Sequence, residues 1–379
     1  MPKSRTPARI VVIAITALSL ISTILTPVLY AGQVTLSWDP VSHPDLAGYR
    51  IYSGLSSRDY DDELDVGNNT SCTISRLVKG ETYYFTTTAY DIYGNESDFS
   101  KEVFCTIPCN NPIPHLEVGD INVNHDWTRV TFNKPFLDPV VVAKPLSFNG
   151  PDYAVVRTRN VTRDGFKIRL QEWDYLDNRH TQETVSFIAI ERGGYLLEDG
   201  TRVEADQFET DIMSGFETVK FKNSFRSIPI VIVNVSTFNG GQTVTTRVKD
   251  VNTQGFKLRM QEQQASSPQH TTETVSYIAW ELSSGTLEGL SFVVNKTNNM
   301  VKHSFYKIVF NDVFINIPSF LADLQTFNGA DTANLRWKNK GRSGVDVKIT
   351  EEQSADDETN HTTEVVGYMV FSVDHEYLP

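Results

Sequence analysis

The sequence predicts an all-β protein in which one N-terminal sandwich precedes three tandem antiparallel β-sandwich repeats. Short segments such as QVTLSW and YAVVRTRNV alternate apolar and polar residues, which is the pattern of half-buried strands. No apolar residues recur at helical spacing between these segments. From about residue 118, a set of motifs recurs with a period of 89 to 90 residues, which indicates internal repetition.

The first 31 residues predict an export signal. Basic residues up to Arg9 precede an apolar run from Ile10 to Leu29, and the small residues Ala31 and Gly32 follow near a cleavage point. The run is long enough to cross a bilayer, so an uncleaved anchor is the alternative. Under either alternative the bulk of the chain is expected to be secreted, periplasmic or at the cell surface.

Composition and charge exclude several classes of partner. The chain has 379 residues, 40% of them hydrophobic, and a formal net charge of −13, which predicts a folded acidic protein. A negative surface repels phosphate backbones and anionic lipid, so neither a nucleic acid nor a membrane surface is an expected partner. Cys72, Cys105 and Cys109 allow one disulfide in an exported chain and leave its pairing open.

Residues 33–107 predict a small sandwich. AGYRIYSG and TYYFTTTAYD continue the alternation, and regularly spaced short strands are typical of an immunoglobulin-like sandwich. Leu77, Gly80 and Tyr83 in LVKGETYYF resemble the fibronectin type III family. The resemblance implies a spacer or a general binding module. NNPIP marks the boundary with the following segment.

Three copies of one unit are expected over residues 118–200, 207–290 and 291–379. Each copy carries Phe-Asn-Gly, then an arginine, a glutamate, a His-Thr pair and a further glutamate. The matching residues are Phe148, Arg157, Glu172, His180 and Glu183; Phe238, Arg247, Glu262, His270 and Glu273; and Phe327, Arg336, Glu351, His361 and Glu364. In ETVSFIAI both strand faces are apolar, so we expect one face to meet the copy's own core and the other a neighbouring copy.

The order of motifs in the first copy resembles the H-type lectin family. The stretches that carry the resemblance are RTRNVTRDGF, QEWD and VSFIAI. In that family a six-stranded antiparallel sandwich forms a trimer that binds N-acetylgalactosamine or related sugars at subunit junctions. The resemblance implies glycan partners and assigns the sugar contacts to Asp152, Arg157 and Trp173. It also suggests that three copies could form an intramolecular pseudo-trimer, with an open row of sandwiches as the alternative.

The chemistry of these residues suits a sugar. An aspartate and an arginine can hold neighbouring hydroxyl groups, and a tryptophan ring offers an apolar platform. Phe166 and Leu170 share one face of GFKIRLQEW, so Trp173 falls on the other face and is expected to meet solvent.

The other copies depart from the family pattern. The second has Gln242 and Gln263 at the positions of the aspartate and the tryptophan. The third keeps Asp331 and Arg336, which we include as candidate sugar contacts, but has Glu352 in place of the aromatic residue. Because the arginine persists where the tryptophan is lost, a structural role beside loop carboxylates is the alternative for it.

Catalytic and metal sites are not expected, and neither is a cofactor. Glu172 and Glu183 recur in every copy, and a unit of this size leaves little room for the cleft that paired catalytic carboxylates need. If His180 lies in the strand, alternation is expected to point His180 and Glu183 to opposite faces, which disfavours chelation; if it lies in the turn, this objection weakens. Three histidines meeting on a ring axis remain the metal alternative. The run DYDDELD is interpreted as a solvated loop rather than a calcium site.

The sequence therefore predicts an exported, non-enzymatic, carbohydrate-binding protein that acts in glycan recognition or adhesion. The alternative is a structural or protein–protein adhesion module that uses the same scaffold without a sugar site.

Overall fold

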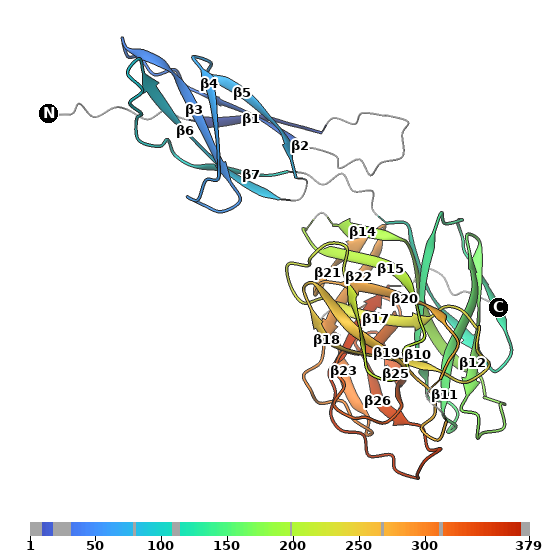
Figure 1. Ribbon diagram of the computed structural model, residues 1–379. Helices are drawn as coiled ribbons and strands as arrows, with labels where there is room; N and C mark the ends of the chain where they lie inside the picture. Colours follow the sequence, from blue (N-terminus) through green and yellow to red (C-terminus); the bar gives the residue numbers. More distant parts are fainter. Residues whose placement is uncertain are drawn as a thin grey trace. The chain divides into compact units, whose positions relative to one another are not determined.

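The protein is built from strands that divide into two compact units, Met1–Asn111 and Pro112–Pro379 (Figure 1). The computed structural model describes residues 10–17, 32–78, 81–107, 114–197, 199–266, 269–310 and 314–372. Every regular element in these ranges is a strand, which confirms the all-β fold class. No helix in the described part of the chain could span a membrane. Gly80, Cys109, residues 1–9 and 18–31, and NNPIP before Pro114 lie outside the described residues.

The first unit consists of two antiparallel sheets with the strand orders β1-β2-β5 and β4-β3-β6-β7. Apolar side chains from both sheets, including Leu36, Ile51 and Phe85, form one core, as the alternating pattern predicts. The strands are β1 (Ile10–Ala17), β2 (Gly32–Trp38), β3 (Leu46–Gly54), β4 (Asp62–Gly67), β5 (Ser71–Leu77), β6 (Thr82–Asp91) and β7 (Val103–Thr106).

Two side chains of this unit bear on the sequence predictions. The hydroxyl of Tyr83 accepts a hydrogen bond from the Val78 amide at 3.1 Å, which ties the start of β6 back to the preceding loop. Cys72 and Cys105 are free thiols, so the predicted disulfide does not join this pair, and burial raises the pKa of both. The second half of the acidic run forms the exposed strand β4, where Asp65 accepts a hydrogen bond from Tyr90 at 3.0 Å.

The second unit contains three sandwiches, each built from six strands. The first has β8 (Leu116–Val123), β9 (Thr128–Thr131), β10 (Pro139–Ser147), β11 (Ala154–Thr162), β12 (Gly165–Glu172) and β13 (Glu183–Glu191). The second has β15 (Arg202–Thr210), β16 (Glu217–Lys220), β17 (Ile230–Val235), β18 (Thr245–Asn252), β19 (Gly255–Gln261) and β20 (Glu273–Trp280). The third has β22 (Leu290–Lys296), β23 (Tyr306–Val309), β24 (Ser319–Leu324), β25 (Ala333–Gly341), β26 (Gly344–Glu351) and β27 (Val366–Phe371). Short strands β14 (Gly193–Leu196) and β21 (Ser283–Leu287) precede the second and third sandwiches.

Each sandwich pairs an inner sheet with an outer sheet in the same strand order. The inner sheets are β8-β13-β10, β15-β20-β17 and β22-β27-β24, and the outer sheets are β9-β12-β11, β16-β19-β18 and β23-β26-β25. Each pair of sheets encloses its own apolar cluster. A short parallel pairing of β10 with β25, through Leu146↔Arg336 and Ser147↔Trp337, joins the first sandwich to the third.

The three inner sheets also share a second core. Ile188 of the first sandwich, Ile278 of the second and Met369 of the third all belong to one buried cluster. The expected two-sided burial of ETVSFIAI is confirmed, because Phe187 faces the first sandwich's own core while Ile188 faces the shared one. Packing against this shared cluster fixes where the loops of neighbouring sandwiches meet.

Candidate functional site

A buried arginine extends from the first sandwich into the second. Arg157 on β11 is 0% exposed, and its guanidinium group donates hydrogen bonds to Glu273 Oε1 at 3.1 Å and to the Gln242 carbonyl at 2.9 Å. The guanidinium carbon lies 4.6 Å from the ring centre of Phe238. An arginine held by a carboxylate, a carbonyl and an aromatic face is strongly oriented.

The same contact occurs at the other two junctions. The equivalent sets are Arg247 with Glu364 and Phe327 of the third sandwich, and Arg336 with Glu183 and Phe148 of the first. The arginine contacts therefore lead from the first sandwich to the second, from the second to the third and from the third to the first.

Each junction glutamate also caps a loop. Glu273 accepts hydrogen bonds from the Thr237 hydroxyl and from the Asn239 and Gly240 amides, the last at 3.2 Å. His270 lies between two carboxylates, with Nδ1 2.6 Å from Glu262 and Nε2 3.2 Å from Glu273. Glu183 and Glu364 bind their own loops and histidines in the same way.

These contacts shift the pKa of the buried groups. Burial alone would raise the pKa of Glu273, but hydrogen bonds from His270, Thr237 and the loop amides outweigh it and bring the pKa to about 2. Burial would lower the pKa of His270, and the two flanking carboxylates raise it instead. Burial lowers the pKa of Arg157 to about 10 although Glu273 opposes the shift. An ionised glutamate between an imidazolium and a guanidinium is consistent with all three directions.

The Phe-Asn-Gly motif fits the same contact. A Cβ atom on Gly240 would lie 2.6 Å from Cε1 of His270, and one on Gly329 would lie 2.5 Å from Cε1 of His361. The loop can therefore approach the histidine only without a side chain at this position. The loop, the glutamate and the histidine of one copy thus form a binding site for the arginine of another copy.

The predicted sugar residues of the first copy take part in different junctions. Arg157 enters the second sandwich, whereas the carbonyl of Asp152 accepts a hydrogen bond from Arg336 of the third at 2.8 Å. The Asp152 side chain is exposed. Asp331 is half-buried, and its carbonyl accepts from Arg247 at 3.3 Å. The structure therefore brings each loop residue together with the arginine of another copy.

Trp173 is 1% exposed, so the expectation that it faces solvent is wrong. Strand alternation correctly separates Trp173 from Phe166 and Leu170, but it does not reveal what covers the opposite side. The loops that follow β12, β19 and β26 are hydrogen-bonded to one another at this end of the unit. The bonds between these loops are Asp174 N to Gln263 Oε1 at 3.1 Å, Gln264 N to Glu352 Oε1 at 2.6 Å, and Gln353 N to Tyr175 Oη at 3.0 Å.

Two tyrosines at the junction of the first and third sandwiches were missed by sequence reasoning. Tyr175 is 40% exposed and Tyr153 is half-buried. The two phenols are close enough for Tyr153 to affect the pKa of Tyr175, which burial raises. At the positions that match Tyr153 the other two copies have threonine, and at those that match Tyr175 they have alanine and serine. An aromatic residue present in a single copy was the signal that could have identified them.

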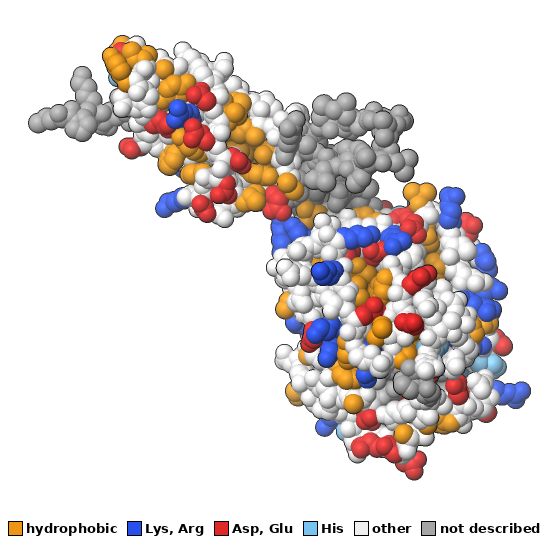
Figure 2. All heavy atoms as spheres, viewed as in Figure 1, with side chains coloured by type: hydrophobic (Ala, Val, Ile, Leu, Met, Phe, Trp, Pro, Cys, Tyr) orange, Lys and Arg blue, Asp and Glu red, His pale blue; other side chains and the backbone are white. Residues whose placement is uncertain are grey.

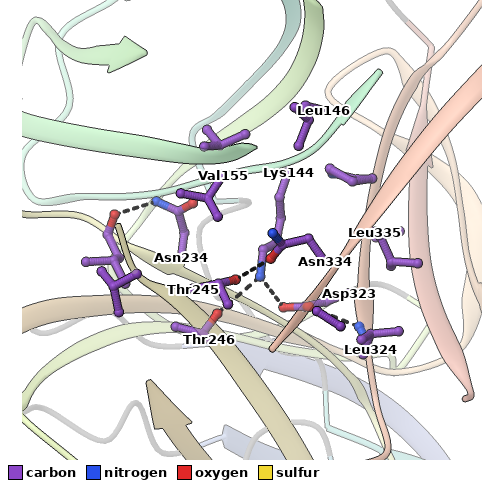
Figure 3. A pocket seen from close by; sticks show the side chains of 16 residues that line it. Lys144, Leu146, Val155, Asn234, Thr245, Thr246, Asp323, Leu324, Asn334 and Leu335 are labelled. Atoms are coloured by element: carbon purple, nitrogen blue, oxygen red, sulfur yellow. Dashed lines mark hydrogen bonds and ion pairs between the residues drawn. The ribbon is translucent and has the colours of Figure 1, made fainter. Parts of the chain in front are cut away.

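A cavity of about 30 Å³ lies where β10, β17 and β24 approach one another (Figure 3). Lys144, Asn234 and Asp323 occupy matched positions on these strands and line it. Lys144 Nζ donates to Asp323 Oδ2 at 2.8 Å and to Thr246 Oγ1 at 3.1 Å. Burial raises the pKa of Asp323, and Lys144 opposes the shift. The space suits a water molecule and is far smaller than a sugar pocket.

The carboxylates and the histidine that were considered as catalytic or metal-binding residues take part in the contacts at the junctions. Glu172 and Glu183 both contact His180, at 3.0 and 3.4 Å, and all three side chains are buried. No group of three His, Cys, Asp or Glu side chains that could hold a metal ion occurs within the described ranges.

Comparisons with known proteins agree with part of this picture. The chain is 32% identical over 258 residues to halomucin of Haloquadratum walsbyi, which covers 65% of this chain and 3% of that protein. It is 33% identical over 109 residues to a Kelch domain-containing protein of Saccharolobus solfataricus, covering 28% of this chain and 14% of the relative. The chain thus spans a small part of both relatives. A chitinase of Bacillus thuringiensis is 15% identical over 49% of this chain and 27% of its own, with a TM-score of 0.18.

A family match falls within the second sandwich. It begins at the first residue of β16 and ends at the last residue of β20, so it includes Arg247, Glu262, His270 and Glu273. Residues 217–280 match the H-type lectin domain.

Proposed function

We propose that this protein is an exported, non-enzymatic lectin that binds glycans in recognition or adhesion. The match of residues 217–280 to the H-type lectin domain carries the proposal. We further propose that the three sandwiches are an intramolecular counterpart of a lectin trimer. The three arginine contacts between sandwiches and the shared apolar cluster support this arrangement.

The junction of the first and third sandwiches is the proposed sugar site. The exposed Asp152 carboxylate supplies acceptors for hydroxyl groups, and the half-exposed rings of Tyr153 and Tyr175 supply apolar faces. Arg336 donates a hydrogen bond to the carbonyl of Asp152 and so positions the loop that carries Asp152. Arg157 and Trp173 then support the scaffold and do not touch the sugar.

The first unit is proposed as a fibronectin type III-like spacer. Its two antiparallel sheets and the hydrogen bond from Val78 to the Tyr83 hydroxyl are features of such sandwiches. The basic and apolar N-terminal sequence supports export. This sequence includes β1, which pairs with β2, so in the exported protein we propose that β2 and β5 form their sheet without β1.

A glycan array run on the full chain, followed by calorimetry with N-acetylgalactosamine and related sugars, tests the proposal. Wild type is expected to bind, and Tyr175→Ala or Asp152→Asn is expected to weaken binding roughly tenfold or more, because each removes a direct contact. Tyr93→Ala, at a 79% exposed tyrosine of the first unit, is the matched control and is expected to change nothing. Binding by no glycan at all would overturn the proposal in favour of a structural adhesion module.

A further inference from the structure

The outer sheet of the first sandwich carries cations on its outward face. Arg159 on β11 pairs in register with Lys167 on β12, which pairs in turn with Arg129 on β9. Arg169 lies opposite the junction residue Arg157 in the same register. Phe166, Ile168 and Leu170 point into the core, so these cations share the other face. Figure 2 shows Lys and Arg side chains, with Asp and Glu side chains among them, along the side of the second unit on which Figure 1 draws β11 and β12.

Within the part of the chain that the structure describes, these four cations have no carboxylate partner. Arg129, Arg159, Lys167 and Arg169 form no ion pair with any described residue, although the chain has a net charge of −13. The position of Lys167 differs in the other sandwiches: Lys257 of the second pairs with Asp250 at 2.9 Å, and the third has Asp346. The positions of Arg159 and Arg169 keep a cation in both, as Lys249 and Arg259 beside Phe216 and as Lys338 and Lys348 beside Phe305. The position of Arg129 is Thr218 in the second sandwich and Lys307 in the third, so the first sandwich alone carries a cation at all four positions.

Trp127 holds two of the guanidinium groups in place. Arg159 lies 4.0 Å and Arg169 4.9 Å from the centre of its ring. The half-buried indole is itself fixed edge-on against Phe238 of the second sandwich, 5.5 Å away. The Nε atoms of both arginines are buried and have no hydrogen-bond partner among the described residues. Burial and the charge of Arg159 both lower the pKa of Arg169, so a bound anion would stabilise the charged form of its guanidinium group.

We propose that this face, defined by Arg129, Arg159, Lys167 and Arg169, binds acidic glycans through carboxylate or sulfate groups. The guanidinium fork matches the geometry of a carboxylate or a sulfate, and the ring of Trp127 keeps two forks ordered before binding. Cross-strand and next-but-one positions on a sheet are spaced about 5 to 7 Å apart, which suits a polymer with regularly repeated charges. The overall negative charge repels any polyanion, and it repels nucleic acids more strongly because their phosphates are densely spaced along the backbone.

This inference rests on the proposed glycan-binding function but uses other residues than the junction site. Calorimetry of the full chain with polygalacturonate, chondroitin sulfate and neutral dextran tests it at low and at high salt. Both acidic polymers are expected to bind, more weakly at high salt, and dextran is expected not to bind. The double variant Arg129→Gln, Lys167→Gln leaves Trp127 and its contacts in place and is expected to weaken binding roughly tenfold or more.

Lys257→Gln is the matched control, because it removes a cation from the same position of the second sandwich, and it is expected to retain affinity. Unchanged affinity in the double variant, or equal affinity for DNA and for acidic glycans, would overturn the proposal. The two sites can fail separately. If Tyr175→Ala loses N-acetylgalactosamine binding but keeps acidic-glycan binding, the two ligands bind at different sites. If wild type binds neutral sugars but no acidic glycan, the proposal for the cationic face is wrong and the proposal for the junction stands.

Discussion

Arg157 of the first sandwich donates a hydrogen bond to Glu273 of the second at 3.1 Å, and neither side chain is exposed to solvent. The two residues are 116 positions apart in the chain. Desolvation of such a pair is costly, and the loop amides, His270 and Phe238 offset it by satisfying the remaining groups. The pair holds neighbouring sandwiches together only while both partners are present.

Removal of one partner of this pair should destabilise the second unit strongly. Arg157→Met leaves Glu273 buried without its cation and is expected to lower the free energy of unfolding by about 3–5 kcal/mol. The double variant Arg157→Met, Glu273→Gln should lose less than the sum of the single changes, because no uncompensated charge remains. Urea unfolding of the four proteins of this cycle measures the coupling. Additive losses would show that the two side chains do not act as a pair.

The second unit should lose stability in acid. The pKa of Glu273 and that of Glu364 are both held at about 2, below the usual 4.5. Each therefore contributes stability that is complete above pH 4.5 and is lost as the pH falls towards 2, up to about 3 kcal/mol per group. His270 has a raised pKa, so its contribution is complete below pH 6.5 and is lost as the pH rises through that raised pKa.

Urea midpoints measured across this pH range check the acid prediction. Glu273→Gln is expected to be less stable at neutral pH and to show a shallower fall between pH 4.5 and 2. An equally steep fall in this variant would mean that other carboxylates carry the acid sensitivity.

Adjacent glycines in one loop should respond differently to the same substitution. Gly240→Ala places a Cβ atom 2.6 Å from His270, whereas no atom lies within 4 Å of a Cβ atom on Gly241. Gly240→Ala is expected to cost about 1–3 kcal/mol through displacement of the histidine, and Gly241→Ala less than about 0.5 kcal/mol. Thermal unfolding of both variants measures the difference. A similar melting temperature for the two would contradict the close packing of loop and histidine.

The ion pair in the small cavity should be replaceable as a unit. Lys144→Asn leaves Asp323 buried without its cation and is expected to cost about 3–5 kcal/mol. The double variant Lys144→Asn, Asp323→Asn gives all three strands the residue that the second already has as Asn234, and it should recover much of the loss. Chemical unfolding compares the two variants. A double variant no more stable than Lys144→Asn would show that the charge pair is not the source of the effect.

Local patterns in the sequence were sufficient for the strands. The alternation in QVTLSW and GFKIRLQEW identifies β2 and β12, because side chains on a strand point alternately to opposite faces. The β-branched, largely apolar run ETVSFIAI identifies β13. The apolar residues on both faces of ETVSFIAI also indicated burial on two sides. Matching offsets showed which positions share a role, including the arginine, the loop glycine and the histidine.

The partner of each of these residues followed from the tertiary structure alone. Packing of the inner sheets around one core sets the arginine of one copy against the glutamate of another and brings the loops after β12, β19 and β26 together. A period in the sequence reports which residues are equivalent, but it contains no information on how equivalent surfaces dock. The sequence therefore determined the strands and their recurrence. The docking of one sandwich on the next decided which polar side chains are buried in the scaffold and which, such as Asp152 and Tyr175, stay exposed, because the burial of a side chain depends on what packs over it.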